Sequence, residues 1–397
     1  MPFAENDMKR VDLLYFDAAS GHRSAAAGLQ SALQAGYPHW PVRMVNIVDI
    51  FDHHPRMGPL VRRGIDRFNR QLQKDKVFDL SGQINLSLLF HDLLGEKGRT
   101  QLARFWGNTP PDVVVSVTPM YNPALFRSVR LLNPAAVCIT IPVDFDEAKP
   151  RYWFTPKVPQ YYLNATDRLY DQARALGIPD SHNLRISGMP VDPACYQLPP
   201  TDRADTLRKL GLDPALPTGF VSFGGQGCSL LTDIAEAVAE AKLAVNLLFM
   251  CGRNEAVREA ISGLPTPYPK AVMGYTSETP IHYLRLANFA IGKPGAMTLT
   301  EAMLTHTPLI ALKSRGMRLV QRGNEDWLLN KQVGLVVNGP RQVASAIKQV
   351  VVSPEYRQRA AKQSHRGVFE AVTQIGQLAN QLAISPRRPA VESGNTL

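Results

Sequence analysis

The chain of 397 residues is 45% hydrophobic and 20% charged, a composition typical of folded soluble domains and not of disordered segments. No apolar run reaches the roughly 18–20 residues that a membrane-spanning helix needs, and the N-terminal segment lacks the apolar core of a signal peptide. The four cysteines form no C-x-x-C pair, which argues against a zinc or disulfide framework. These features predict an intracellular protein of two or three domains.

The formal net charge of +10 predicts an anionic partner. The segment 56–76 carries seven of the basic residues, and apolar residues recur through it at helical spacing, from Leu60 and Val61 to Ile65, Phe68 and Leu72. This pattern predicts a basic amphipathic helix that can lie on an anionic membrane, with Arg62, Arg63, Arg67 and Arg70 as contacts. An ordinary surface helix is the alternative. Because the chain has no zinc finger, RNA-binding aromatic pattern or basic tail, we do not predict nucleic-acid binding.

The first half of the chain alternates short apolar strands with helices, which predicts parallel βαβ units. The expected strands are residues 11–16, 42–47, 112–117, 136–141 and 184–187. An alanine-rich helix is expected at 24–34, with Ser24 as its N-cap.

A turn-rich stretch at 198–202 then predicts a domain boundary, after which the pattern restarts. The strands expected beyond it are 219–223, 245–250, 271–273, 289–291, 309–312 and 335–337, with helices at 232–242 and 356–384. We therefore expect an N-terminal Rossmann-like domain at 1–198 and a second at 199–360. A helix at 361–384 is expected to pack back on the first domain, before a disordered tail at 385–397. Glycine loops at the strand ends of both sheets predict a ligand in the cleft between them.

The turn from Gly292 to Thr298 joins the strand at 289–291 to a helix. We expect Gly292 and Gly295 to adopt backbone angles closed to other residues. A glycine turn that leads into a helix N-terminus presents free N–H groups that suit phosphate, here at Ala296, Met297 and Thr298. Glu301, about one turn into the helix, is placed to reach a sugar diol joined to that phosphate. Thr298 and Glu301 also have the spacing of a capping box, which needs no ligand.

Residues 292–303, together with Gly323-Asn324, resemble the donor-site signature of one glycosyltransferase family. It includes monogalactosyldiacylglycerol synthases, bacterial diacylglycerol glucosyltransferases and the N-acetylglucosaminyltransferase that forms lipid II. The resemblance extends over about residues 11–380. It implies an α/β protein with the GT-B fold, in which two Rossmann-like domains face each other across a cleft.

The resemblance also implies a set of residues that bind the nucleotide-sugar. Gly224, Gly225, Gln226 and Gly227 resemble the loop that faces the donor diphosphate, and the segment around Tyr275 resembles the strand end that holds the base. Arg253 can stack on that base or reach a phosphate, or it is a solvated loop arginine. Gln321 and Asn324 match the region that reads the donor sugar. The chain departs from the family there, since Arg315-Gly316-Met317-Arg318 replaces a Pro-Gly turn, so the sugar stays open.

In the first domain, Ser20-Gly21-His22-Arg23 is similar to the family's Gly-Gly-His-Arg loop, which makes His22 a candidate general base and places Gly21 beside the acceptor. The alternative is a loop histidine that only positions the backbone. Asp144 matches an acidic element of the family that orients or replaces this base. No metal ligands have fitting spacing, and the family stabilises the leaving diphosphate without a bound metal, so no cofactor is expected.

The resemblance thus implies an inverting transfer of a hexose from a nucleotide-sugar, expected to be UDP-linked, to a lipid acceptor such as diacylglycerol. We expect a cytoplasmic enzyme that is peripheral on the inner face of the membrane. Two alternatives stay open: a GT-B enzyme with a soluble acceptor, and a non-catalytic nucleotide-sugar-binding protein of the same fold.

Overall fold

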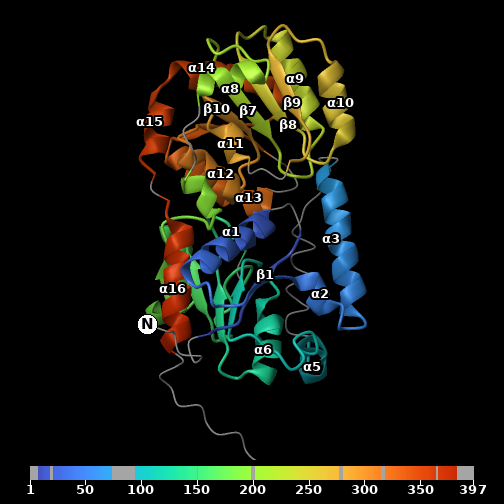
Figure 1. Ribbon diagram of the computed structural model, residues 1–397, viewed down its shortest axis with the longest axis vertical. Helices are drawn as coiled ribbons and strands as arrows, with labels where there is room; N and C mark the ends of the chain where they lie inside the picture. The colour runs from blue at the N-terminus through green and yellow to red at the C-terminus, as the bar shows by residue number, and fades with distance from the viewer. Residues whose placement is uncertain are drawn as a thin grey trace, which may run out of the picture.

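The protein contains two six-stranded sheets, each with helices packed against it, and the two lie one above the other along the long axis of the molecule (Figure 1). The computed structural model describes residues 8–17, 21–73, 94–149, 151–197, 202–276, 280–313, 318–363 and 365–381. Among these residues, no helix is both long and apolar enough to cross a membrane.

The first sheet is parallel throughout and is built from the N-terminal half of the chain. In spatial order its strands are β2 (Val42–Asn46), β1 (Val11–Tyr15), β3 (Val113–Ser116), β4 (Val137–Thr140), β5 (Tyr161–Asn164) and β6 (Asn183–Arg185). The central strands β3 and β4 are buried along their whole length, as expected for β-branched runs covered on both faces. β5 was not predicted from the sequence.

The helices of this half are α1 (Gly21–Gly36), α2 (Ile47–Phe51), α3 (Met57–Gln73), α5 (Glu96–Ala103), α6 (Asn122–Leu132) and α7 (Asp167–Ala175). The prediction that Ser24 caps the alanine-rich helix is wrong, because α1 begins three residues earlier and Ser24 lies within its first turn. As a result, His22 belongs to the helix N-terminus. The helix predicted within 56–76 is present as α3, although Lys74 and Lys76 lie outside the described residues.

The second sheet is also parallel throughout. Its spatial order is β12 (Gly334–Val337), β11 (Leu309–Leu312), β10 (Phe289–Gly292), β7 (Thr218–Ser222), β8 (Asn246–Met250) and β9 (Lys270–Met273). Its helices are α8 (Arg203–Lys209), α9 (Leu230–Glu240), α10 (Glu255–Gly263), α11 (Ile281–Leu284), α12 (Ala296–Leu304), α13 (Arg318–Asn330) and α14 (Val343–Val352).

The last part of the chain forms two helices, so the prediction of one long helix at 356–384 is wrong. α15 (Glu355–Ala361) contacts α12 in the second half, whereas α16 (Gly367–Gln381) packs against α1 and β4 in the first (Figure 1). The chain crosses between the halves where the helix is interrupted. Gly367 lies so close to Gly188 that an added Cβ would meet the Gly188 carbonyl oxygen. The predicted tail at 385–397 and most of the boundary stretch 198–202 lie outside the described residues.

The strand orders fix where a ligand can bind. In the first sheet the order reverses between β1 and β3, and in the second between β7 and β10. At such switch points the connections leave on opposite faces and open a crevice at the carboxyl ends of the strands. The segments that follow these four strands contain His22, Met120, Gly224 and Gly295. The predicted α/β architecture of two Rossmann-like units is therefore confirmed.

Candidate active site

A cleft of about 910 Å³ lies between the two halves and is lined by both. Most of the residues predicted for the site line it: Gly21, His22, Arg63, Arg67, Asp144, Gly224, Gly225, Gln226, Gly227, Arg253, Tyr275, Gly295, Ala296, Met297, Thr298, Glu301, Gln321 and Asn324. Gly292, Arg62 and Arg70 are not part of its lining. Residues predicted from separate parts of the chain are thus brought to one cavity.

His22 stands in the first turn of α1, with its ring stacked on Phe16 at a centroid distance of 4.5 Å. Its Nδ1 lies 2.6 Å from the Val117 carbonyl oxygen, which follows β3. Because a carbonyl can only accept, Nδ1 carries the proton and Nε2 keeps its lone pair. Burial lowers the pKa of His22 to about 4, against the opposing effect of the Val117 bond, so the ring is neutral at physiological pH.

Asp144 follows β4 and lines the same cleft. Burial raises its pKa to about 7, although hydrogen bonds from Trp153 and Asn324 favour the ionised form. The Trp153 indole donates to Asp144 Oδ2 at 3.0 Å. The loop that carries Trp153 is in turn held by Glu147, whose carboxylate accepts from the backbone N–H groups of Tyr152 and Trp153 at 2.8 and 3.0 Å.

The turn between β10 and α12 differs in detail from the prediction. Gly295 is the N-cap of α12 and has ordinary extended angles (φ −76°, ψ 143°), and Gly292 has no left-handed backbone either. Gly292 is needed for another reason, since an added Cβ would come within 2.4 Å of the Ser222 carbonyl oxygen on β7. The capping-box alternative is wrong, because the helix starts at Ala296 and no described side chain caps it.

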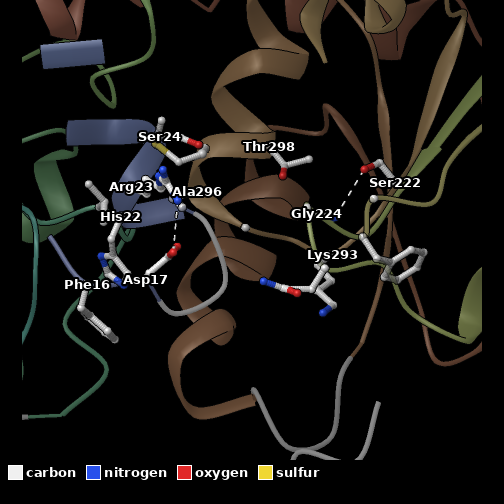
Figure 2. A pocket seen from close by; sticks show the side chains of 18 of the residues that line it. Phe16, Asp17, His22, Arg23, Ser24, Ser222, Gly224, Lys293, Ala296 and Thr298 are labelled. Atoms are coloured by element: carbon white, nitrogen blue, oxygen red, sulfur yellow. Dashed lines mark hydrogen bonds and ion pairs between the residues drawn. The ribbon is translucent and has the colours of Figure 1, made fainter. Parts of the chain in front are cut away.

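Glu301 lies on the side of α12 that faces the cleft. Burial raises its pKa to about 7, and its carboxylate makes no hydrogen bond or ion pair with any residue of the described ranges. A carboxylate held in this way, beside a helix N-terminus, is available for a ligand that donates hydrogen bonds. Figure 2 shows the N-terminal turn of α12, with Ala296 and Thr298, facing the start of α1 with His22 and Arg23. The two helices meet there, since a Cβ on Gly21 would lie 3.8 Å from Met297 Cγ.

The glycine loop after β7 does use left-handed angles, at Gly224 (φ 87°) and Gly227 (φ 69°). It packs directly on the turn after β8, where the Arg253 N–H donates to the Gly225 carbonyl at 2.9 Å. The Arg253 guanidinium lies 4.0 Å from the centroid of the Tyr275 ring, which is 57% exposed. Both residues line the cleft, so the pair offers a flat surface to a ligand there.

The helix α13 presents Gln321 and Asn324 to the cleft, and the two differ in their hydrogen bonding. Gln321 is 6% exposed, and its buried Oε1 has no hydrogen-bond partner among the residues that the structure describes. The Asn324 amide donates to the Pro294 carbonyl at 2.8 Å and accepts from the Phe145 N–H at 2.9 Å. Within the described residues, Gln321 therefore has an unpaired oxygen for a sugar hydroxyl, whereas Asn324 already bonds to both halves of the protein.

The helix α3 contributes its apolar residues to the cleft wall, together with two of the predicted arginines: Leu60, Val61, Arg63, Ile65, Arg67 and Phe68. Arg63 and Arg67 are exposed at the edge of this wall. Arg62 points elsewhere and forms an ion pair with Asp52, and Arg70 is exposed outside the cleft. The side chain of Leu72 lies outside the described residues.

Three residues of the site were not chosen from the sequence. Lys293 lines the cleft directly before α12, near Gly224 (Figure 2). Trp153 and Glu147 support Asp144 as described above. Lys293 lay within the glycine turn and could have been selected as a cation for phosphate. Nothing local distinguished Trp153 or Glu147, because their partners are set by how the loop folds back. Within the described ranges, no cluster of three histidine, cysteine, aspartate or glutamate side chains could hold a metal ion.

A cleft between two doubly wound parallel sheets, with glycine turns after the strands that flank it, defines the GT-B class of fold. Solved structures of this class match the chain over nearly its whole length. MurG from Acinetobacter baumannii matches with a TM-score of 0.60 at 14% identity, covering 93% of this chain and 99% of that one. The UDP co-structure of S. aureus MnaA matches with a TM-score of 0.57 at 13% identity, covering 96% and 99%. The predicted GT-B fold is confirmed.

In sequence, the chain is similar to glycolipid-forming glycosyltransferases, which confirms the resemblance described above. Monogalactosyldiacylglycerol synthase 1 of Arabidopsis thaliana is 24% identical over 353 residues, which cover 85% of this chain but only 64% of that protein. The processive diacylglycerol beta-glucosyltransferase of Bacillus subtilis is 23% identical over 366 residues, which cover 90% and 91%. No family model matches the chain.

Proposed function

We propose that this protein is an inverting glycosyltransferase that moves a hexose from a UDP-sugar to a lipid acceptor such as diacylglycerol, at the cytoplasmic face of a membrane. The main support for the proposal is the set of residues that line the cleft. A neutral histidine, a helix N-terminus beside an unpartnered carboxylate, and an apolar wall with basic edges all line the same cavity. The names of the sequence relatives support the transfer of a hexose to diacylglycerol.

The acceptor hydroxyl loses its proton to His22 Nε2 or to Asp144 as it attacks the anomeric carbon. The new bond joins the acceptor oxygen to that carbon, and the bond from the carbon to the diphosphate oxygen breaks on the opposite side, which inverts the configuration. His22 has the available lone pair, while Asp144 has the pKa closer to physiological pH, at about 7. Both are retained as candidates for the base.

The donor lies on the second half of the protein. Its ribose diol donates to Glu301, and its diphosphate meets the N-terminus of α12 and the loop from Gly224 to Gly227. Negative charge that develops on the leaving UDP is stabilised by these backbone dipoles and by Lys293 at the same turn. We assign no metal and no cofactor. The base stacks on the Arg253–Tyr275 pair, and Gln321 Oε1 accepts from a hydroxyl of the sugar.

The acceptor reaches the cleft along α3. Its lipid part packs against Leu60, Ile65 and Phe68, and Arg63 and Arg67 at the edge of this wall face the anionic headgroups. A polar acceptor would leave this apolar lining unfilled. The lining therefore supports an acceptor with an apolar part, such as a lipid.

The test uses UDP-glucose, UDP-galactose and UDP-N-acetylglucosamine, each radiolabelled in the sugar, with the full-length protein and a membrane lipid extract. Label from one of them should become chloroform-soluble, and the same incubation with His22→Ala should give far less. Label that passes only to a water-soluble product would refute the lipid acceptor. If the parent protein neither binds UDP in a calorimetric titration nor transfers label, the glycosyltransferase proposal is wrong.

A further inference from the structure

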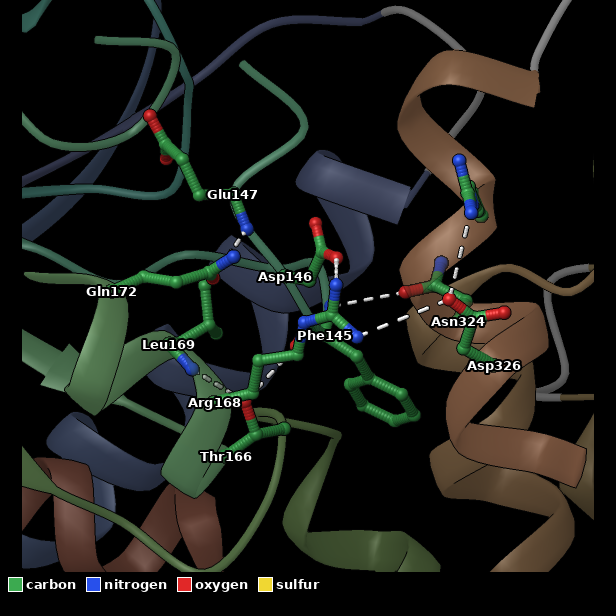
Figure 3. A network of polar contacts seen from close by, with 10 residues as sticks. Phe145, Asp146, Glu147, Thr166, Arg168, Leu169, Gln172, Asn324 and Asp326 are labelled. Carbon is green, nitrogen blue, oxygen red and sulfur yellow. Dashed lines mark hydrogen bonds and ion pairs between the residues drawn. The ribbon is translucent and has the colours of Figure 1, made fainter. Parts of the chain in front are cut away.

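A buried polar contact made by Asn324 of α13 joins the two halves of the protein. Asn324 is 1% exposed. Its Oδ1 accepts from the backbone N–H of Phe145, which belongs to the turn after β4 in the first half, at 2.9 Å. Its Nδ2 donates to the Pro294 carbonyl, in the turn before α12 in the second half, at 2.8 Å. One side chain thus connects the two walls of the cleft, and Figure 3 shows its position beside Phe145.

The residues around Asn324 pack closely enough to hold this contact in place. An added Cβ on Gly323 would come within 2.5 Å of Asp146, so the helix can approach the turn only because residue 323 has no side chain. The Phe145 ring packs against Trp327, with centroids 4.7 Å apart. The Phe145 carbonyl accepts from Thr166 at 3.0 Å, which fixes the turn from the other side. The position of the turn is therefore set from both halves.

A second contact crosses the same boundary at the surface. Arg168 of α7 lies 2.6 Å from Asp146 and 3.9 Å from Asp326 of α13 (Figure 3). Its side chain is 52% exposed, and ion pairs at such exposure add little to stability. This contact provides a matched control, since it also joins the first half to α13 but is exposed to solvent.

We propose that Asn324 is a positioning residue that holds the two halves in register and fixes the turn that carries Asp144. The inference deepens the proposed function and rests on it where turnover is concerned. The amide bonds to the backbone of Phe145, the residue after Asp144, and to the backbone of Pro294, so it ties the turn that carries the candidate base to the turn before α12. When the contact opens, the turn that carries Asp144 loses its hydrogen bond to α13.

The first experiment measures the arrangement of the halves without any turnover. All four native cysteines are buried, so dyes can be placed at Leu131→Cys on α6 and Val352→Cys on α14, both exposed in the parent. Single-molecule energy transfer then compares the parent with Asn324→Ala, Asn324→Asp and Arg168→Gln. We expect the ratio of closed to open molecules to fall about 10-fold in both Asn324 variants, the usual worth of one or two buried hydrogen bonds. Arg168→Gln should stay within about twofold.

The second experiment separates positioning from sugar recognition. For the Asn324 variants we expect kcat to fall about 10- to 100-fold because the base is misplaced, with the Kd for UDP and the KM for the donor within about threefold. Asn324→Asp keeps the acceptor for Phe145 and the size of the side chain, so it tests the inference if Asn324→Ala folds poorly. An unchanged closed-to-open ratio in the folded variants would overturn the inference. So would a loss confined to the donor KM. The energy-transfer comparison tests the role of Asn324 in holding the halves together even if the parent shows no transferase activity.

Discussion

Substitution of Glu301 by glutamine or alanine should weaken UDP binding and leave folding intact. The Glu301 carboxylate has no hydrogen bond or ion pair within the described residues, so its removal costs the protein no such interaction. A hydrogen bond between a diol and a charged carboxylate is worth about 1–3 kcal/mol, which predicts a ~5- to 150-fold rise in the Kd for UDP.

The pH dependence of UDP affinity and of stability provides a second test of this prediction. Burial raises the pKa of Glu301 to about 7, so half of the ligand-free protein carries the neutral acid at pH 7. Below that pH the ligand must expel the proton, and the affinity for UDP should fall about tenfold per pH unit. Above about pH 7 the buried ionised carboxylate disfavours the folded state, since its folded pKa exceeds the ordinary value. Glu301→Gln should therefore keep or raise the melting temperature there.

Calorimetric titration with UDP between about pH 5.5 and 8.5 measures the affinity, and melting curves over the same range measure the stability. Glu236→Gln, an exposed glutamate in the middle of α9, is the matched control and should change neither. If Glu301→Gln binds UDP as tightly as the parent does, or lowers the melting temperature by several degrees, Glu301 is a structural residue and the assignment to the ribose is wrong.

Three further predictions concern the first half of the protein. His22→Ala should lower turnover by ~10²–10⁴ with UDP affinity intact, and turnover near the parental value would leave Asp144 as the base. If Asp144 must be ionised, kcat at saturating donor should rise with pH through an apparent pKa of about 7, and Asp144→Asn should abolish this limb; a limb near pH 4 would instead report His22. Saturating donor is needed because the titration of Glu301 changes donor affinity over the same pH range. Replacement of Arg62, Arg63, Arg67 and Arg70 by glutamine should release the protein from anionic vesicles. Each positive charge near the surface contributes about 1 kcal/mol to membrane binding, and Arg62 should contribute least because it pairs with Asp52. Glutamine at the exposed Arg174, Arg185 and Arg208 should not release it, and equal sedimentation of both variants would exclude α3 as the membrane contact.

The alternation of strands and helices could be predicted from the sequence alone, because it depends on residues that are neighbours in the chain. Apolar β-branched runs such as 113–115 form buried strands, and glycine or proline turns end them. Parallel strands require crossovers, so two such series imply two doubly wound sheets. The glycine turn before α12 and the basic amphipathic pattern of α3 could be predicted for the same reason, since both depend on residues close together in the chain.

Local patterns failed where the outcome depended on packing. Thr298 and Glu301 have the spacing of a capping box, but the helix begins two residues before Thr298 and turns Glu301 toward the cleft. Gly292 was predicted to need backbone angles that only glycine adopts. It is required instead because β7 lies too close to leave room for a side chain. The long C-terminal helix is interrupted because the chain must cross from one half of the protein to the other.

The partners of the site residues could be seen only in the tertiary structure. The sequence selects Asn324 beside the donor, yet its amide bonds to Phe145, 179 residues away. The tautomer of His22 is set by Val117, 95 residues away, and the pKa of Asp144 by burial under a loop that Glu147 holds. The fold can be predicted from composition and periodicity because the tendency toward helix, strand or core is a property of each residue itself. Hydrogen-bond partners and burial depend on where both sheets and the loops between them come to lie.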